Sequence, residues 1–206
     1  MKKTLLLAGV ATALFAMNAS ATELNPYVGA KFRYVDMSSD VKLGDTFAVD
    51  DNVMGGSIAI GTSFKTSKGS VRTELEYNKN QEAEKSHDMT VIGSGVVFGG
   101  NLEVETQSVM LNAYYDIDTG TELTPYVGAG IGFAKTEGTL SALGESESID
   151  DNSFAWQVGA GVGYAVTENV TVDAGYRYVD YGDISDYDVD IETTAHELYV
   201  GARYSF

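Results

Sequence analysis

The chain has 206 residues, enough for one domain of ordinary size, and it contains no cysteine, which excludes disulfides, thiol catalysis and thiolate metal sites. Asp and Glu total 30 against 13 Lys and Arg, so the formal net charge is −17 at pH 7. An acidic balance this large argues against a nucleic-acid partner, because the phosphates would be repelled.

The first predicted element is a secretory signal peptide at residues 1–21. It begins with the basic pair Lys2 and Lys3, continues through a mostly apolar run, and ends in a small-x-small cleavage site at residues 19–21. A retained N-terminal anchor is the alternative. Removal of the two lysines would take the net charge from −17 to −19 and leave one domain at residues 22–206.

Downstream of this signal, no run approaches the roughly 18 consecutive apolar residues of a membrane helix. Apolar and polar side chains alternate instead with a period of two, which is typical of β-strands whose two faces meet different surroundings. The first four predicted strands are residues 27–35, 53–64, 69–78 and 106–116. They are joined by a polar loop at 36–52, a tight turn at 65–68 and a long connection at 79–104, in which residues 91–100 fit either a loop or a strand extension.

The remaining predicted strands are residues 123–135, 154–164, 170–178 and 195–206. Short turns at 118–120 and 167–169 alternate with a polar loop at 136–152 and an acidic loop at 183–194. Within residues 154–182, one face holds apolar side chains with aromatic ends, and the other holds glycine, amide, carboxylate and guanidinium groups. The total of eight strands is even, as expected for a bacterial single-chain barrel.

The two faces of the predicted strands differ in charge. The apolar face carries no charged residue within the spanning stretches, whereas the other face carries five basic and four acidic residues: Lys31, Arg33, Arg72, Glu74, Glu76, Asp173, Arg177, Glu197 and Arg203. A soluble ligand-binding barrel would show the reverse, with apolar side chains inside and charges outside. The sequence therefore predicts an all-β fold, an eight-stranded antiparallel up-and-down transmembrane β-barrel with short periplasmic turns and longer extracellular loops.

Charged side chains enclosed in a narrow barrel must pair, because an unpaired buried charge is strongly destabilising. We therefore predict a charge network in the barrel interior, centred on Arg72, Glu74, Glu76, Arg177 and Arg203. Aromatic side chains near the strand ends are interpreted as a girdle at the membrane interfaces. This predicted aromatic girdle comprises Phe154, Trp156, Tyr164, Tyr176, Tyr178, Tyr204 and Phe206.

Two runs of alternating glycine, at residues 128–132 and 159–163, superficially suggest a dinucleotide-binding loop. Such a loop needs a strand-to-helix turn, whereas these glycines recur at a period of two within strands. We interpret them as inward positions that leave room for larger Tyr, Arg and Gln side chains from neighbouring strands.

An acidic cluster near the last predicted strand comprises Asp180, Asp183, Asp186, Asp188, Asp190 and Glu192. Its spacing superficially follows a calcium-binding loop, but Ile191 stands where such a loop needs glycine, and no helices flank it. We interpret the cluster as a solvated acidic loop, with no metal ligands assigned and weak divalent-cation binding left open.

The two histidines are His87 and His196. His196 lies on the predicted lipid-facing side near a loop, where lipid-modifying barrel enzymes use a histidine or carboxylate with a nearby serine. Ser185 is in a predicted loop and no His-x-Ser pairing exists, so a nucleophilic triad is unsupported and no catalytic residue is expected.

A resemblance to a known family rests on four segments: VMLNAYYDI at 109–117, TPYVGAGIGFA at 124–134, the stretch 154–183 that begins FAWQVGAGVGYAV, and the terminal LYVGARYSF. They resemble the opacity-type outer-membrane β-barrel surface proteins, related to the small OmpA/OmpX-like barrels. The resemblance implies a Gram-negative outer membrane and a C-terminal strand, ending in Phe206, that the barrel assembly machinery recognises. In pathogen members the loops mediate host-cell adhesion, but the resemblance does not extend to the loops of this chain.

We therefore expect an integral outer-membrane protein that presents acidic extracellular loops for surface interaction or adhesion, or for envelope integrity. A narrow passive porin is the alternative. The expected partners are outer-membrane lipid and lipopolysaccharide, the barrel assembly machinery, and a host or environmental surface ligand. Neither a cofactor nor enzymatic activity is expected.

Overall fold

The computed structural model describes residues 24–43, 45–80, 83–90, 97–142, 145–186 and 189–206. The predicted signal peptide lies outside the described residues. The described strands are β1 (Asn25–Leu43), β2 (Asp45–Thr66), β3 (Gly69–Asn80), β4 (Ala83–Thr90), β5 (Val97–Ile117), β6 (Leu123–Ala142), β7 (Glu145–Ala165), β8 (Val170–Asp186) and β9 (Val189–Ser205). Across this part of the chain, no helix is long and apolar enough to cross a bilayer.

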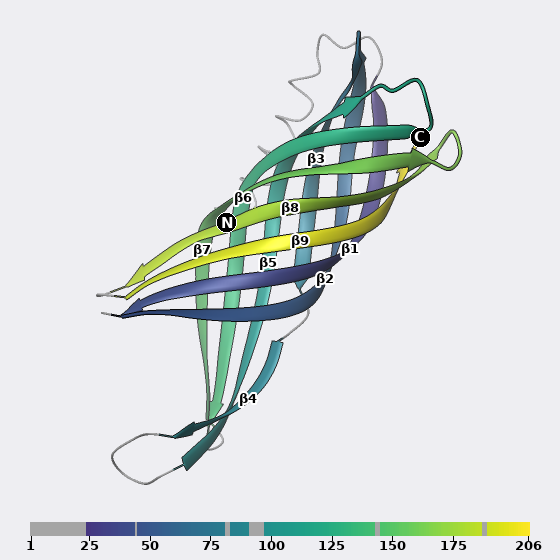
Figure 1. Cartoon of the computed structure of the whole chain (residues 1–206). Coiled ribbons are helices and arrows are strands. Elements are labelled where there is room, and N and C mark those ends of the chain that lie inside the picture. Colours follow the sequence, from purple (N-terminus) through teal and green to yellow (C-terminus); the bar gives the residue numbers. More distant parts are fainter. Residues whose placement is uncertain (1–23, 44, 81–82, 91–96, 143–144, 187–188) are drawn as a thin grey trace, which may run out of the picture.

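The strands form one closed antiparallel ring (Figure 1). Their order in the sheet is β3-β2-β1-β9-β8-β7-β6-β5-β4, and an additional pairing of β3 with β5 closes the ring. Within the described residues β4 pairs with β5 alone, so eight strands make the barrel and β4 extends one of its hairpins. The predicted eight-stranded antiparallel barrel is confirmed.

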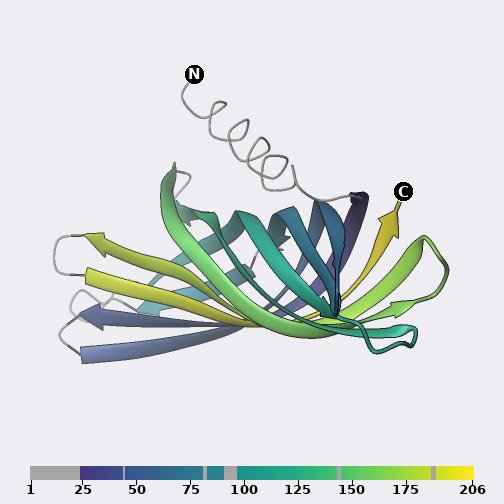
Figure 2. The ribbon, with the colours of Figure 1, turned by 90° about the horizontal axis from the view of Figure 1, so that it is seen from above.

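One end of the barrel, the turn end, holds the short connections. Turns near residues 67–68, 118–122 and 166–169 join neighbouring strands there, as predicted. Asp118 Oδ1 stabilises one of them by accepting a hydrogen bond of 2.9 Å from the Gly120 N–H. Figure 2 shows the C-terminus on this side of the molecule, opposite the β1–β2 and β8–β9 hairpins.

At the other end, the hairpin end, the strands are longer than the sequence predicts. β2 contains 22 residues and β7 contains 21, whereas about 9–11 tilted residues cross a bilayer. The loops predicted at 36–52, 136–152 and 183–194 are wrong, because backbone pairing continues through most of them. The connection predicted at 79–104 is also wrong, because β4 pairs with residues 97–104 of β5. Residues 91–96 lie outside the described residues.

The physical reason is visible in the sequence of these hairpins. Val189 and Ile191 alternate with Asp190 and Glu192, so the period of two persists although the composition is polar. Antiparallel pairing satisfies backbone N–H and C=O groups that an irregular loop would leave to water. Polar composition alone was therefore a poor guide to where each strand ends.

Beyond the barrel the ring separates into two sheets. Among the described residues, β7 and β8 pair only as far as Trp156 opposite Asp180, and β2 and β3 only as far as Gly55 opposite Asn80. Past these points β2, β1, β9 and β8 continue as a first outer sheet, and β4, β5, β6 and β7 continue as a second outer sheet. Figure 1 shows the first outer sheet extending to the left and the second downward.

Alternation along the barrel strands separates apolar from charged side chains. Ile58, Ile131 and Leu198 are 63%, 55% and 58% exposed, whereas Glu76 and Glu197 are fully buried. A sheet closed into a ring encloses one face only, so the buried charges lie in the lumen and the exposed apolar side chains lie on the outer surface. This sidedness is that of a membrane barrel.

Inward tyrosines fit over glycines of the neighbouring strand. Four such pairs stand directly opposite each other: Tyr27 and Gly61, Tyr114 and Gly128, Tyr126 and Gly161, and Tyr199 and Gly175. A Cβ atom on Gly61 would lie 2.6 Å from the ring of Tyr27, and one on Gly161 would lie 2.5 Å from the Tyr126 hydroxyl. The prediction that inward glycines leave room for larger neighbours is confirmed.

Candidate functional site

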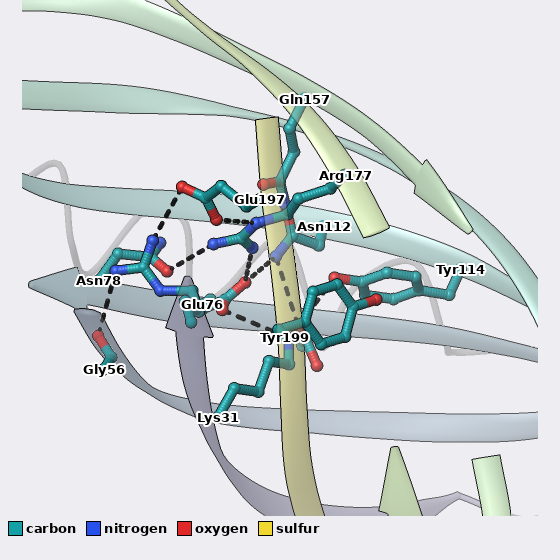
Figure 3. A network of polar contacts seen from close by, with 12 residues as sticks. Lys31, Gly56, Glu76, Asn78, Asn112, Tyr114, Gln157, Arg177, Glu197 and Tyr199 are labelled. Carbon is teal, nitrogen blue, oxygen red and sulfur yellow. Dashed lines mark hydrogen bonds and ion pairs between the residues drawn. The ribbon is translucent and has the colours of Figure 1, made fainter. Parts of the chain in front are cut away.

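The lumen contains a row of alternating charges, the charge chain, which consists of Glu74, Lys31, Glu76, Arg177, Glu197 and Arg33 (Figure 3). Lys31 Nζ lies 2.8 Å from Glu74 Oε1 and 3.3 Å from Glu76 Oε1. The two glutamates are two residues apart on the same face of β3, so this lysine bridges a pair of like charges and reduces their repulsion.

Arg177 and Arg33 continue the charge chain toward the hairpin end. Arg177 Nη1 lies 3.0 Å from Glu76 Oε2, and its Nε lies 2.5 Å from Glu197 Oε2. Arg33 Nη1 lies 2.9 Å from Glu197 Oε1, and both of these side chains are fully buried. Tyr181 adds a hydrogen bond of 3.0 Å from its hydroxyl to Glu197 Oε1. Each inner member thus contacts opposite charge on two sides, as a buried ion requires.

Several side-chain contacts cross the lumen instead of following the barrel wall. Arg177 is on β8 and Glu76 is on β3, and three strands separate these two in either direction round the ring. Tyr126 of β6 and Tyr199 of β9 meet hydroxyl to hydroxyl at 3.0 Å. Side chains from opposing walls therefore bridge the lumen.

Two separate ion pairs lie nearer the turn end. Arg72 Nε donates to both carboxylate oxygens of Asp116, at 2.9 and 2.7 Å, and Arg203 Nε lies 2.6 Å from Asp173 Oδ2. The Arg72 guanidinium also lies 4.6 Å from the Tyr114 ring centroid and 4.9 Å from that of Tyr126. The guanidinium is therefore held by a carboxylate whose two oxygens share the Nε–H, and by two aromatic faces.

All nine residues of the predicted interior network lie on the lumen side, but they do not form one cluster. Glu74, Glu76 and Arg177 belong to the charge chain, whereas Arg72 and Arg203 form the separate pairs. Sequence reasoning missed Asp116, which makes the interior balance five acidic against five basic groups. Asp116 lies four residues after the inward Asn112 on β5, so the alternation of the strand places both side chains on the lumen face.

Buried amides complete the network and were also missed. Asn112 Nδ2 donates to Glu76 Oε2 at 2.8 Å, and Gln157 Nε2 donates to Asn112 Oδ1 at 2.5 Å. Arg177 Nη2 donates to Asn78 Oδ1 at 3.0 Å. These amides link β5 and β7 to the charge chain, so strands that contribute no ion to it are tied to the same interior.

Apolar side chains close the lumen nearer the hairpin end, and nothing in the sequence reasoning anticipated them. This apolar cap comprises Val35, Met110, Ala134, Ala155, Val179, Tyr181 and Ala195, with Met37 and Val53 packed against it. Cap residues stand two positions closer to the hairpin end than network residues of the same strand, as Val35 does relative to Arg33 and Val179 relative to Arg177. An apolar constriction of this kind excludes water and ions.

The predicted aromatic girdle lies on the outer surface in two groups. Tyr164, Tyr204 and Phe206 are near the turn end, and Phe154, Trp156, Tyr176 and Tyr178 are near the level where the outer sheets begin. Several of the rings contact each other: the centroids of Trp156 and Tyr178 are 5.6 Å apart, and those of Tyr204 and Phe206 are 5.3 Å apart. A role as interface anchors stays a prediction.

The predicted acidic loop is instead the paired ends of two strands. Residues 183–186 of β8 pair with residues 189–192 of β9, and Asp188 lies outside the described residues. Within the part of the chain that the structure describes, no group of three or more His, Asp or Glu side chains could hold a metal ion. Weak divalent-cation binding by this acidic segment stays a prediction.

His196 belongs to an aromatic cluster on the outer surface. Its Nδ1 is hydrogen-bonded to the Tyr176 hydroxyl, and the two rings stack with an interplanar angle of 22°. The ring of Tyr178 lies 5.4 Å away in an edge arrangement. The side chain of His87 lies outside the described residues.

Known proteins resemble this chain in sequence as well as in fold. The sequence profile of the outer membrane protein beta-barrel domain matches residues 5–206. The chain belongs to this family. Its relative PagN, an outer membrane protein of Salmonella typhimurium, is 31% identical over 175 residues, covering 75% of this chain and 73% of PagN.

Solved structures of outer-membrane barrels share the fold. Neisserial surface protein A is 24% identical with a TM-score of 0.58, covering 88% of this chain and 97% of that one. Ail, the attachment invasion locus protein of Yersinia pestis, in complex with the heparin analogue sucrose octasulfate, is 22% identical with a TM-score of 0.50, covering 88% and 99%. The predicted outer-membrane location is confirmed. In such barrels the short turns face the periplasm and the longer connections face the exterior.

Proposed function

We propose that this outer-membrane protein presents its two outer sheets at the cell surface, for adhesion or other surface interaction, or for envelope integrity. The closed lumen carries this proposal: the charge chain bridges opposing walls, and the apolar cap covers the hairpin end. A barrel closed in this way is a rigid base for what it carries. The strands that continue past the bilayer are the part that can meet a partner.

The same lumen argues against the alternative of a narrow passive porin. An eight-stranded barrel has an interior that side chains just fill, and here Arg177 and Glu76 meet across it. Beyond them the apolar cap adds a layer that ions enter only at a high desolvation cost. We expect purified protein in a planar bilayer to give no steady, reproducible current, and such a current would favour the porin.

The charge of the outer sheets indicates what they attract. Residues 36–52, 136–152 and 180–192 contain five, five and six acidic residues against one lysine. Such a surface favours cationic partners and repels anionic ones, with strong salt dependence. Ail has been solved with a heparin analogue, which is a polyanion, so the shared fold does not imply a shared ligand for this chain.

The remaining expected roles follow from the sequence and are part of this proposal. Residues 1–21 direct export, the terminal strand ending in Phe206 engages the barrel assembly machinery, and the outward apolar side chains contact lipid and lipopolysaccharide. His196 serves in the outer aromatic cluster, and the protein has no enzymatic activity.

Hairpin replacement tests the proposal. Short turns would replace residues 36–52, 83–104, 136–152 and 181–192, singly and together, leaving the charge chain and most of the cap intact. Cells carrying each variant would be assayed for attachment to surfaces coated with basic matrix proteins, and for sensitivity to detergent. We expect folding to persist and at least one of the two properties to fall. Unchanged attachment and unchanged resistance in the fully trimmed barrel would overturn the proposal.

A further inference from the structure

A groove on the outer wall of the barrel lies over β1, β9 and β8, three strands that are neighbours in the ring (Figure 1). Its volume is about 560 Å³, within the roughly 300–1,000 Å³ of known small-molecule sites. The outward side chains that line it are apolar or aromatic: Phe32, Tyr34, Ala174, Tyr176, Leu198 and Val200. The groove is therefore a feature of the lipid-facing surface.

The groove is hollow because a short side chain stands among long ones. Ala174 of β8 is in register with Val200 of β9, and Val200 is in register with Phe32 of β1. Two positions nearer the hairpin end, Tyr176 of β8 and Tyr34 of β1 point outward in the same way. The groove thus lies in the half of the wall nearer the hairpin end. That half is in the leaflet that faces the exterior.

At the hairpin end of the groove, the surface changes from apolar to aromatic and polar. His196 Nδ1 is hydrogen-bonded to the hydroxyl of the groove residue Tyr176. The ring of Tyr178 lies 5.4 Å from that of His196 and 5.6 Å from that of Trp156. Asp36 is exposed and is in register opposite His196. We call Trp156, Tyr178, His196 and Asp36 the rim of the groove.

The rim has the chemistry of a carbohydrate site rather than of a phosphate site. The C–H groups of a sugar ring pack against the negative faces of aromatic rings. A carboxylate accepts hydrogen bonds from sugar hydroxyls, and an imidazole can donate or accept them. A head group that carries net negative charge would instead be repelled by Asp36 and by Asp180, which is in register opposite Trp156.

We propose that the groove and its rim bind one glycolipid of the outer leaflet, with an acyl chain along the groove and a sugar ring on the rim. The inference rests on the proposed contact of the wall with membrane lipid, and it names the class of lipid. Within a bilayer an acyl chain gains little by moving from other chains to an apolar wall, because both are equally apolar. The sugar contacts of the rim therefore supply the selectivity.

Quenching of the single tryptophan tests this site, because Trp156 belongs to the rim. Barrels in phosphatidylcholine nanodiscs, one barrel to a disc, would receive the same mole fraction of one of three lipids with identical brominated acyl chains. The three are a glycolipid with an uncharged disaccharide head, phosphatidylcholine and phosphatidylglycerol. We expect a relative association constant at least about threefold higher for the glycolipid than for either phospholipid.

The outcomes separate this inference from the proposed lipid contact. Equal quenching by the three lipids, or stronger quenching by a phospholipid, would overturn the glycolipid site and leave the lipid contact standing. No quenching by any of the lipids would overturn the lipid contact as well. Preference for the glycolipid that vanishes in discs holding two barrels, with cross-linking through the groove, would make a second copy of the chain the occupant and would also overturn the inference.

A matched pair of alanine variants locates the acyl chain. Ala174→Phe fills the groove, whereas Ala113→Phe makes the same change at an exposed, outward alanine of β5. Both variants add an apolar side chain to a lipid-facing surface, so both should fold. We expect Ala174→Phe to lower the association constant of the glycolipid at least about threefold, and Ala113→Phe to leave it unchanged. Equal effects of the two substitutions would overturn the inference.

A matched pair of charge variants tests the rim. Asp36→Ala removes the carboxylate beside His196, and its control, Glu168→Ala, removes an exposed carboxylate at the turn end. We expect Asp36→Ala to weaken association of the glycolipid and to strengthen that of phosphatidylglycerol, each about twofold or more, because a hydrogen-bond acceptor and a repulsive charge are lost together. The control should change neither. A shift of both lipids in the same direction would overturn the inference.

Discussion

The charge chain and the apolar cap occupy successive layers of one lumen, and they close it by different physics. In the charge chain each ion is held by the next, so that Glu76 and Glu197 share Arg177. In the cap, side chains such as Val35 and Val179 exclude water by contact area alone. The inward positions of this barrel are therefore not uniformly polar. The dry cap also strengthens the ionic layer below it, because charges attract more strongly where water is excluded.

The largest expected effect is the loss of a shared ion. Arg177→Met would leave Glu76 and Glu197 facing each other without their common partner, and we expect the free energy of unfolding to fall by about 3–5 kcal/mol. Urea unfolding in lipid vesicles, followed by the fluorescence of Trp156, the single tryptophan, would measure it. Arg177→Lys keeps the positive charge but not the planar set of guanidinium donors, so its free energy of unfolding should fall by less. Equal losses in the two variants would contradict a charge-based role.

A smaller loss is expected at the separate pair nearer the turn end. Arg203→Gln would leave the buried Asp173 without its bidentate partner, lowering the free energy of unfolding by about 1.5–3 kcal/mol. The same urea titration applies. The double variant Arg203→Gln/Asp173→Asn should recover part of the loss, because no uncompensated charge remains. A double variant less stable than the single one would mean that this site does not act as a pair.

Substitutions in the apolar cap should lower the free energy of unfolding in proportion to the side-chain volume that they remove. Val35→Ala deletes two methyl groups from a fully buried site, which should lower the free energy of unfolding by about 1–2 kcal/mol. Planar-bilayer recordings of this variant should still show no steady current, because the charge chain closes the layer beneath. A steady current from Val35→Ala would show that the cap alone seals the lumen.

The smallest expected effect lies on the outer surface. Tyr176→Phe removes the hydroxyl that is hydrogen-bonded to His196 but keeps the stacked ring, so the free energy of unfolding should change by about 0.5 kcal/mol or less. Detergent sensitivity of cells carrying this variant, compared with cells carrying the parent protein, would show whether the cluster matters in the membrane. A loss as large as that of Arg177→Met would contradict the view that the lumen dominates stability.

The face of the strand on which each side chain lies could be predicted from the sequence, because it depends only on local alternation. Arg72, Glu74 and Glu76 share one face of a strand whatever their partners are, so period-two alternation placed them correctly. Which charges meet could not be predicted in the same way. The contact between Glu76 and Arg177 depends on the stagger and closure of the ring, which alternation along one strand does not encode.

Other misses came from not following the inward parity to the end of each predicted strand. Val35 and Met37 follow Arg33 at the same parity, so extending the inward series would have revealed the apolar cap. Asp116 was missed for the same reason at the opposite end of β5. In the outer hairpins the sequence predicts loops, because their polar composition outweighs their alternation.

The pairing of β1 with β9 joins the first and last strands of the barrel, and it also brings together charges from the two ends of the chain. The carboxylate that pairs with Arg33 of β1 belongs to Glu197 of β9, which lies 164 residues later in the sequence. A barrel that still lacked β9 would hold Arg33 and Arg177 without the counter-ion that both of them share. A partly assembled barrel without the C-terminal strand would therefore bury these two guanidinium groups with less compensating charge than the complete barrel provides.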